Sequence, residues 1–328
     1  MTTPPLLEVR KLRVEFPTRR ATLVALDDVS FDIAPGEILG VVGESGAGKS
    51  LTGAAIIGLL DPPGRVASGE IRFEGQRIDN LSYEAMRKLR GRHIGAIFQD
   101  PLTSLNPLYT VGRQLIETIQ THLPLNDAQA RQRAIKLLQE TGIPAAEARI
   151  DQYPHQFSGG MRQRVVIALA LAGEPKLIVA DEPTTALDVS IQSQIISLLK
   201  RLCKDHGAAV MLITHDMGVI AETCDRVAVM YAGRIVEIGP VHDVIHSPAH
   251  PYTVGLMGSI PAMDEDRERL LQIDGAMPRL NAIPTGCAFN PRCPKVFERC
   301  RTERPELLPA GATRAACWLH AAALKEAA

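Results

Sequence analysis

The sequence lacks three features, and each absence excludes a class of protein. Its 328 residues contain no apolar run near the roughly 18 residues that a membrane-spanning helix needs, so we do not expect the chain to cross a bilayer by itself. It has no excess of either charge, with 36 Lys+Arg against 37 Asp+Glu, which argues against a globally basic nucleic-acid-binding protein and against an acidic disordered chain. It also lacks a secretory signal, because Glu8, Arg10 and Lys11 fall where the apolar core of such a signal belongs, so we expect no export.

Cysteine is scarce, with six in the chain, and four of the six follow residue 240. Without a sign of export we expect reduced thiols or metal ligands rather than disulfides. The length predicts about two domains. The sequence has no internal repeat, and low complexity is confined to an alanine-rich tail over residues 321–328.

Strand and helix patterns alternate through the first 240 residues. Alternating apolar residues over 6–42 predict strands, and the last of these is apolar throughout, as is typical of a mainly parallel sheet covered on both faces. Helical periodicity replaces the strand signals over residues 100–157. We therefore predict an open α/β core over 1–240 with a helical insertion at about 100–157, and a small proline-rich domain over 241–328. Further core strands are expected at 94–98, 177–180, 208–214 and 226–231.

A glycine-rich segment matches the phosphate-binding pattern G-x-x-x-x-G-K-[ST]. It comes after a buried strand and before a helix that we expect to start near Lys49, which is the context that the pattern requires. Backbone N–H groups and the helix amino terminus would hold phosphate oxygens, Lys49 would neutralise the β- and γ-phosphates, and Ser50 would ligate Mg²⁺. The predicted ATP-binding residues here are Gly43, Glu44, Ser45, Gly46, Ala47, Gly48, Lys49, Ser50 and Leu51.

Two carboxylates, Asp181 and Glu182, end a second apolar strand. A carboxylate at a buried strand end costs desolvation energy unless it faces a cation, so Asp181 is expected to face the Mg²⁺ of the nucleotide. Glu182 points elsewhere in an extended chain and can accept a proton from an attacking water. The alternative is that the two carboxylates only cap the following helix.

The segment from Phe157 to Arg164, which reads FSGGMRQR, resembles the signature of ABC-type ATPases, with Phe and Met where the family usually has Leu and Gln. The other motifs of that family follow in the same order. Gln99 resembles the glutamine of the loop before the helical insertion, Thr185-Ala186-Leu187-Asp188 the dimer-contact loop, and His215 the switch histidine. Phe16 is the candidate for the aromatic residue that stacks on adenine, with a core aromatic as the alternative.

This resemblance implies an ABC-type P-loop ATPase fold, with an antiparallel β subdomain and a helical insertion attached to the α/β core. It also implies ATP hydrolysis by in-line attack of water on the γ-phosphate, with Glu182 as the base and His215 on the γ-phosphate. Gln99 would sense the γ-phosphate. The Mg²⁺ ligands implied by the resemblance are Ser50, Gln99 and Asp181.

The resemblance further implies that one copy of the chain cannot complete an ATP site. Ser158, Gly159 and Gly160 would close over ATP held by the P-loop of a homologous ATPase subunit, and Asp188 would bridge the two subunits. In this family the partner is generally a distinct chain, so we expect a heterodimer.

Motifs beyond residue 240 narrow the family. The segments His250-Pro251-Tyr252-Thr253, Ser259-Ile260-Pro261, Ile273-Asp274-Gly275 and Gly286-Cys287 resemble the tail of ATPase subunits from dipeptide and oligopeptide importers. The resemblance implies a peripheral protein at the cytoplasmic face of the inner membrane. Its partners would be two multi-spanning permease subunits and a periplasmic or extracellular solute-binding protein, and no nucleic acid.

Three alternatives compete with a peptide importer. The subfamily also includes importers of nickel and glutathione. A soluble regulatory or DNA-repair ATPase could be built on the same fold, although such proteins usually carry two cassettes or a long coiled coil. An iron–sulfur redox or sensor protein would make the cysteines primary and the ATPase accessory.

Four cysteines follow the spacing C-x5-C-x6-C-x16-C, which fits neither common zinc-finger nor common ferredoxin spacing. Thiolates in a segment with little apolar core suit a structural Zn²⁺ or an iron–sulfur cluster, and free thiols are the third option. In the importer subunits that this chain resembles, these positions hold a [4Fe-4S] cluster, so we expect that cluster, with Zn²⁺ as the alternative. The expected ligands are Cys287, Cys293, Cys300 and Cys317, and the cations expected to offset their charge are Arg292, Lys295, Arg299 and Arg301. The other two, Cys203 and Cys224, are expected to be core residues.

Overall fold

The computed structural model describes residues 4–184, 188–258 and 272–321. The chain forms two compact units that interleave along the sequence. The first comprises Met1–Leu7, Ile33–Ile38 and Phe73–Ile213, and the second comprises Glu8–Asp32, Leu39–Arg72 and Thr214–Ala328. Two predicted motifs, residues 185–187 of the dimer-contact loop and residues 259–261 of the importer-like tail, lie outside the described residues, as does most of the alanine-rich tail.

Three parallel strands form the sheet of the first unit: β6 (Ile94–Ile97), β7 (Leu177–Asp181) and β8 (Ala209–Ile213). Every residue of β8 is buried, which explains why this strand is apolar throughout. The ladder pairs Ala180 with Leu212 and Asp181 with Ile213, so the carboxylate is the last residue of its strand. These strands confirm three of the predicted core segments to within one residue at each end.

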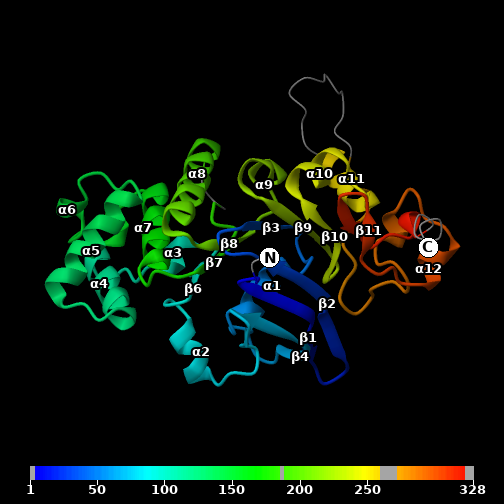
Figure 1. The fold of residues 1–328 in the computed structure, drawn as a ribbon, viewed down its shortest axis with the longest axis horizontal. Helices are drawn as coiled ribbons and strands as arrows, with labels where there is room; N and C mark the ends of the chain where they lie inside the picture. Colours follow the sequence, from blue (N-terminus) through cyan, green and yellow to red (C-terminus); the bar gives the residue numbers. More distant parts are fainter. Residues whose placement is uncertain (1–3, 185–187, 259–271, 322–328) are drawn as a thin grey trace. The chain divides into compact units, whose positions relative to one another are not determined.

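Helices follow β6 and form the predicted insertion (Figure 1). Helix α5 begins with a capping box between Asn126 and Gln129, which satisfies amide groups at its start. It packs on α4, α6 and α7. The helical residues predicted to share a face, Ala130, Ala134, Leu137 and Leu138, are all buried. The insertion comprises α3 (Pro101–Ser104), α4 (Val111–His122), α5 (Asp127–Glu140), α6 (Ala146–Arg149) and the 3₁₀ turn η1 (Pro154–Gln156), and it is followed by α7 (Gly159–Leu171).

The first unit has three further elements. They are β5 (Gln76–Arg77), α2 (Tyr83–Leu89) and α8 (Val189–His206). Helix α2 is capped by Ser82, whose side chain accepts a hydrogen bond from the Ala85 amide at 3.3 Å. Helix α8 packs on α7 and buries Cys203, where burial raises the pKa of the thiol to about 12. The prediction that Cys203 is a core residue is confirmed.

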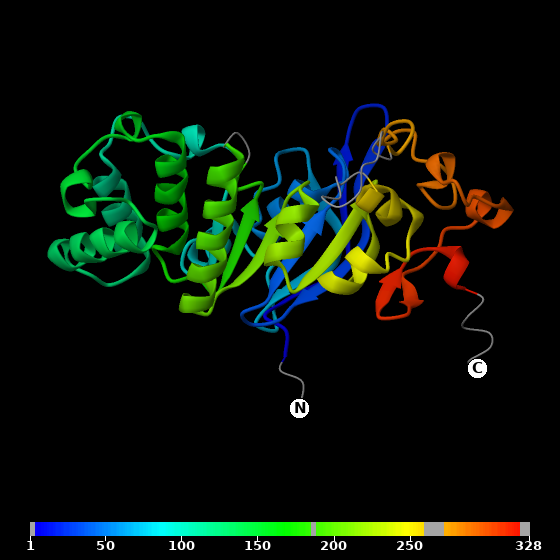
Figure 2. The ribbon, with the colours of Figure 1, turned by 90° about the horizontal axis from the view of Figure 1, so that it is seen from above.

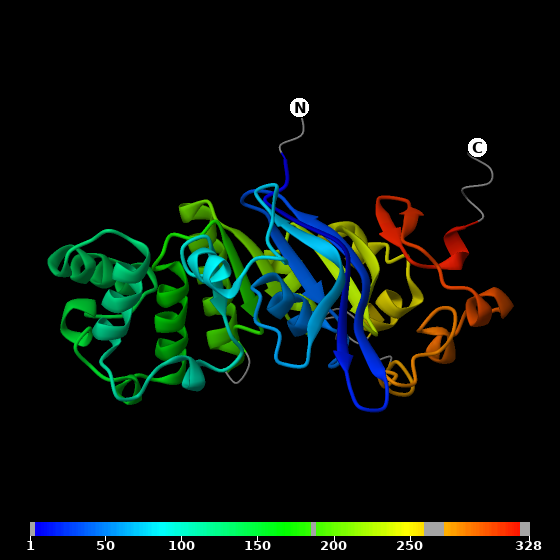
Figure 3. The ribbon, with the colours of Figure 1, turned by 90° about the horizontal axis from the view of Figure 1, so that it is seen from below.

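The second unit contains a twisted sheet in which β2 (Thr22–Ile33), β1 (Leu7–Pro17) and β4 (Arg65–Phe73) are hydrogen-bonded neighbours (Figure 3). Its other strands run β3-β9-β10-β12-β11. The predicted strand β3 (Ile38–Val42) is buried along its whole length and pairs in parallel with β9 (Arg226–Tyr231). The sequence analysis missed β10 (Arg234–Pro240), which folds back on β9 through a turn at Gly233, where φ is 77°.

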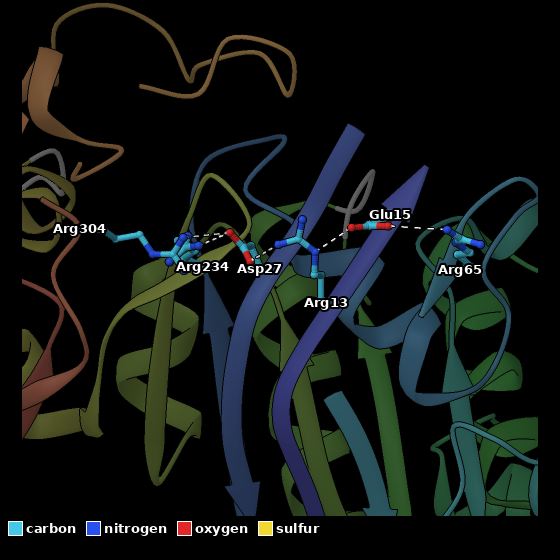
Figure 4. A network of polar contacts seen from close by, with 6 residues as sticks. All are labelled: Arg13, Glu15, Asp27, Arg65, Arg234 and Arg304. Atoms are coloured by element: carbon cyan, nitrogen blue, oxygen red, sulfur yellow. Dashed lines mark hydrogen bonds and ion pairs between the residues drawn. The ribbon is translucent and has the colours of Figure 1, made fainter. Parts of the chain in front are cut away.

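A chain of ion pairs links β1, β2 and β10 (Figure 4). The Asp27 carboxylate accepts from Arg13 at 2.9 Å and from Arg304 at 3.1 Å, and it also pairs with Arg234. Arg13 in turn pairs with Glu15 at 2.7 Å, and these interactions raise the pKa of the Arg13 guanidinium. The network fixes the strand that carries the candidate adenine-stacking residue.

Aromatic packing holds the carboxyl-terminal segment of the second unit. The ring centroids of Tyr231 and Tyr252 lie 4.7 Å apart, and Phe289 lies 5.2 Å from Tyr231. All three side chains are buried, so the expectation of little apolar core in this segment is wrong at this point. In Figure 2 the yellow α10 lies beside α9, against which it packs. The elements are α9 (Met217–Thr223), α10 (Val241–His246), α11 (Pro251–Gly258), η2 (Asn290–Arg292), α12 (Glu298–Thr302), β11 (Leu308–Ala310), β12 (Thr313–Ala315) and η3 (Trp318–His320).

The helices described by the structure include none with both the length and the hydropathy that a bilayer crossing requires.

Candidate functional site

The predicted phosphate loop joins β3 to α1 (Lys49–Ile56), so the helix begins at the expected residue. Three of its glycines have positive φ: 152° at Gly43, 84° at Gly46 and 102° at Gly48. A Cβ on Gly43 would lie 2.3 Å from the carbonyl oxygen of Met230, whereas a Cβ on Gly46 would meet nothing within 4 Å. The loop is thus tightly packed on its protein side and open at its tip, as a site for phosphate oxygens must be.

The amino end of α1 faces this open tip without a side-chain cap. Gly48 is the cap residue, and it has no side chain to make a capping hydrogen bond. The first turn of the helix contains no acidic residue. The partial positive charge at the start of the helix therefore has no anionic side chain in its first turn. Thr52 closes the turn by donating to the carbonyl of Gly48 at 2.9 Å. This arrangement fits the binding of phosphate.

Lys49 lies over the loop that precedes it. Its side chain is 6% exposed, and its Nζ donates to the carbonyls of Gly43 at 2.8 Å and Glu44 at 3.1 Å. A buried ammonium is stabilised by such acceptors and by an anion brought beside it. The structure therefore holds the one lysine of the motif at the phosphate loop, as the pattern predicts.

Two residues of the carboxyl-terminal segment support the loop, and the sequence analysis missed their role. The Tyr252 hydroxyl accepts a hydrogen bond from the Glu44 amide at 2.9 Å. Arg292 donates to the Glu44 carboxylate at 2.9 Å and to the Tyr231 hydroxyl at 3.4 Å. Burial alone would lower the pKa of Arg292, but its hydrogen bonds to Glu44 and Tyr231 raise it above the ordinary value. Tyr252 belongs to the segment His250-Pro251-Tyr252-Thr253. In the sequence analysis this segment indicated the family, but it gave no sign that Tyr252 contacts the phosphate loop.

The candidate catalytic carboxylate lies in the first unit, directly after β7. Glu182 has a φ of 45°, and its amide donates to the carbonyl of Ile213 at 2.9 Å. The amide of the exposed Gln99 side chain donates to the Glu182 carboxylate at 3.1 Å. The structure therefore joins two predicted catalytic residues that are 83 positions apart in the chain. The predicted Mg²⁺ ligands divide between the units, with Ser50 in one and Gln99 and Asp181 in the other, and their shared role stays a prediction.

The signature residues open α7. Ser158 caps the helix by accepting from the Met161 amide at 3.4 Å, and both Ser158 and Gly159 are exposed. A Cβ on Gly160 would lie 2.9 Å from Cγ2 of Ile191 on α8, so glycine permits the two helices to pack here. Asp188 is exposed and is the cap residue of α8. These positions suit contact with another molecule, which stays a prediction.

The remaining nucleotide candidates lie in the second unit. His215 is exposed and follows the buried Thr214, whose hydroxyl accepts from the Asp216 amide at 3.1 Å. Phe16 is partly exposed near the end of β1, with its ring against Gly64, where a Cβ would lie 2.7 Å from the ring. Neither the histidine's contact with γ-phosphate nor the stacking on adenine is tested by these positions.

The four-cysteine prediction needs correction. All four thiols line one small hollow of 10 Å³, which has room for about one water. Yet in the parts of the chain that the structure describes, no group of three or more His, Cys, Asp or Glu side chains is arranged to hold a metal ion. Burial raises the pKa of Cys287 to about 11 and raises the pKa values of Cys293 and Cys317. The expected [4Fe-4S] cluster, with Zn²⁺ as its alternative, is therefore wrong for Cys287, Cys293, Cys300 and Cys317, because the described residues form no metal-binding group there.

The cations expected around that cluster also have other partners. Arg292 pairs with Glu44 as described above. Arg299 pairs with Glu303 at 2.8 Å and lies over the ring of Trp318, 3.6 Å from its centroid. These contacts stabilise the segment by ion pairing and by cation–π attraction.

Comparisons with known proteins agree with this geometry. Residues 26–185 match the family model described as ABC transporter, and residues 236–300 match the model described as oligopeptide/dipeptide transporter, C-terminal region. The chain is 50% identical to the dipeptide transport ATP-binding protein DppD of Escherichia coli (strain K12) over 302 residues, which cover 92% of each chain. It is 47% identical to the oligopeptide transport ATP-binding protein OppD of Salmonella typhimurium over 300 residues, covering 92% of this chain and 89% of that protein.

Solved structures give the same result for the fold. The dimeric ATP-binding cassette MJ0796, in a post-hydrolysis state bound to ADP and Pi, matches with a TM-score of 0.64 and 28% identity, covering 72% of this chain and 98% of its own. The protein cbiO1 of Clostridium perfringens, part of the ABC transporter complex cbiONQ, also matches with a TM-score of 0.64, at 32% identity, covering 74% of this chain and 91% of its own. The predicted α/β ABC-type fold is confirmed. The chain belongs to the ABC transporter family of dipeptide and oligopeptide transport ATP-binding proteins.

Proposed function

We propose that this chain hydrolyses ATP to power the uptake of dipeptides or oligopeptides through an ABC importer. The main observation that supports this proposal is the phosphate loop, which combines an open glycine tip, a helix start without a side-chain cap and the buried Lys49 amine. The names of the peptide-transport relatives supply the solute class.

Hydrolysis in this proposal rests on the predicted phosphate-binding and catalytic residues. The loop from Gly43 to Ser50 binds the phosphates, and Glu182 takes a proton from water as it attacks the γ-phosphate. The hydrogen bond from Gln99 orients the Glu182 carboxylate, so a change at Gln99 alters the position of the base. Ser50, Gln99 and Asp181 would hold Mg²⁺, which would neutralise charge on the phosphate oxygens.

The second half of each ATP site comes from a homologous subunit in this proposal. Ser158, Gly159 and Gly160 contact the partner's ATP and Asp188 lies at the dimer contact, whereas His215 acts with Glu182 and Gln99 and holds the γ-phosphate. The exposure of Ser158, Gly159, Asp188 and His215 supports this assignment. We assign the partner to a distinct homologous chain, so that the pair is a heterodimer.

The remaining assembly follows from the importer family. Two multi-spanning permeases hold the ATPase pair at the cytoplasmic face of the inner membrane, and a periplasmic or extracellular protein delivers the solute. Residues 1–240 form the ATPase domain and 241–328 the importer-type domain. The two family models, which match residues 26–185 and 236–300, support that division.

Reconstitution tests the proposal. The chain is purified from membranes with the subunits that accompany it, placed in proteoliposomes, and assayed for ATP-dependent uptake of a labelled dipeptide, a labelled oligopeptide, nickel and glutathione. Uptake of peptide alone is expected. Uptake of nickel or glutathione instead would replace the solute, and full ATPase activity of a chain that never associates with membranes would support a regulatory ATPase.

A further inference from the structure

The motif His250-Pro251-Tyr252-Thr253 reaches the phosphate loop across a gap of 208 positions in the chain. Its tyrosine hydroxyl accepts the hydrogen bond of the Glu44 amide at 2.9 Å. The Glu44 carbonyl accepts a hydrogen bond from Lys49 at 3.1 Å, and the Glu44 carboxylate accepts one from Arg292 at 2.9 Å. Glu44 is therefore held at its amide, its carbonyl and its side chain at once.

We propose that Tyr252 and Arg292 are positioning residues of the ATP site, which fix Glu44 so that the following loop amides keep the conformation that binds phosphate. This inference rests on the proposed ATP-binding function. It gives the importer-type carboxyl-terminal segment a direct part in nucleotide affinity, through a support that we call the Glu44 clamp: Glu44, Tyr252 and Arg292.

Arg292 is itself rigidly placed. Its side chain is 7% exposed, and its guanidinium donates to the carbonyls of Ile273, Asp274 and Gly275 at 3.2, 2.8 and 3.3 Å. An arginine with these acceptors loses little freedom when it binds a carboxylate. The Glu44 side chain is consequently tied to a segment at the far end of the sequence.

Tyr252 is also held in place by a series of hydrogen bonds. Its amide donates to Nδ1 of His250 at 3.0 Å, and the His250 amide donates to the buried Glu237 carboxylate at 2.9 Å. Glu237 lies in β10 and also accepts from the Ala249 amide at 2.8 Å and from the Thr313 hydroxyl at 3.2 Å. The clamp therefore rests on a strand of the sheet, so its position is set by the fold.

The first test removes a single oxygen. Tyr252→Phe keeps the ring against its aromatic neighbours and deletes the acceptor for the Glu44 amide. An amide that loses a partly buried acceptor should weaken ATP binding by roughly threefold to tenfold, because one hydrogen bond has that net value. The Kd for ATP is measured by equilibrium titration on the full chain, and kcat at saturating ATP is expected to change by less than twofold.

The matched control lies at the next position. The Thr253 hydroxyl is buried and has no hydrogen-bond partner among the residues that the structure describes, so Thr253→Val removes a hydroxyl from the same motif without touching the clamp. We expect unchanged ATP affinity for Thr253→Val and a melting temperature for both variants within a few degrees of the wild type. Equal ATP affinity of Tyr252→Phe and wild type would overturn the inference, whereas a wild-type chain that binds no ATP would overturn the proposed function instead.

A double-mutant cycle tests whether Arg292 acts through Glu44. Glu44→Gln and Arg292→Gln should each weaken ATP binding by several-fold, and the double variant should be no weaker than the worse of the two, because both changes break one contact. Additive losses would show that Arg292 acts elsewhere and would remove it from the clamp. The cycle is read from ATP affinity and from KM against kcat, which a general loss of stability would not separate.

Discussion

The phosphate loop and the signature loop are held in opposite ways. Around Glu44 the backbone and side chain are fixed by Tyr252, Lys49 and Arg292, contacts that come from three different segments. Ser158, by contrast, is exposed and has one capping hydrogen bond of 3.4 Å. The half of the site proposed to bind this chain's own ATP, the built half, is held by contacts from three segments, while the half proposed for a partner's ATP, the uncovered half, is exposed at a helix end.

This difference predicts which functions each half should control. The built half should determine ATP affinity even in an isolated subunit. The uncovered half should leave that affinity unchanged and affect only hydrolysis in the assembled pair. Four experiments can break or sharpen the distinction.

The largest effect is expected at Glu182. Glu182→Gln should lower kcat by roughly 100-fold to 10,000-fold, because general-base catalysis has that range, while ATP binding is retained and the closed dimer accumulates. Single-turnover hydrolysis and size-exclusion chromatography with ATP measure both outcomes. Glu174→Gln is the matched control, because Glu174 also has positive φ, at 56°, and lies outside the site. Full turnover by Glu182→Gln would remove it as the base.

The second-largest effect is expected for Lys49→Ala. Two charge-assisted hydrogen bonds to phosphate account for a loss in ATP affinity of about 100-fold or more. The loss should appear already in the isolated subunit, measured by titration with ATP. Lys88→Ala, on the exposed surface of α2, is the control for loss of a lysine. Undiminished affinity of Lys49→Ala would contradict the phosphate-loop assignment.

Ser158→Ala tests the uncovered half. We expect the ATPase rate of the assembled dimer to fall by about tenfold, because the loss of one hydrogen bond to the partner's ATP has about that effect. The ATP affinity of the isolated subunit should stay unchanged. The substitution also removes a helix cap, at a cost of about 1 kcal/mol. Ser82→Ala removes the equivalent cap of α2 and controls for that cost. A weaker ATP affinity in the isolated Ser158→Ala subunit would contradict the proposed division.

The last effect, a dependence of stability on pH in the built half, concerns folding and not ATP binding or hydrolysis. Burial, with a smaller contribution from His320, lowers the pKa of His250 to about 3, against 6.5 for an ordinary histidine. The unfolded chain therefore binds a proton that the folded chain refuses between pH 6.5 and 3, so stability should fall as pH falls through that window, by at most about 1.4 kcal/mol per unit. His250→Asn, which keeps a side-chain acceptor for the Tyr252 amide, should flatten the slope in urea titrations. Equal slopes would show that His250 does not contribute.

The sequence predicted the parts of the site whose chemistry is local. The phosphate loop requires glycines at fixed positions with positive φ, so Gly43, Gly46 and Gly48 could be recognised from their spacing. The strands around it were equally readable, because β3 and β8 are buried on both faces and are apolar throughout. The structure brings Gln99 and Glu182 into contact, and the roles that the family resemblance implies for them stay predictions.

Contacts between distant parts of the chain could not be predicted from the sequence. Nothing in the sequence around Arg292 indicates a partner 248 positions earlier, so it was interpreted as a cation beside a cluster. The cysteine spacing was misleading for a similar reason, because spacing fixes the order of the thiols and not whether their sulfurs converge on one point. Strand β10 was missed because its buried Glu237 interrupts the apolar pattern, and the amides that satisfy that carboxylate belong to residues 249 and 250.

The clamp also has a consequence for synthesis of the protein. Glu44 leaves the ribosome 208 positions ahead of Tyr252, the residue that receives its amide hydrogen bond. At ordinary rates of translation, about 5 to 20 residues per second, that delay is roughly 10 to 40 s. During this interval the nascent chain has a nucleotide motif without its final support, so its affinity for ATP should reach the full value only when Tyr252 and Arg292 have emerged.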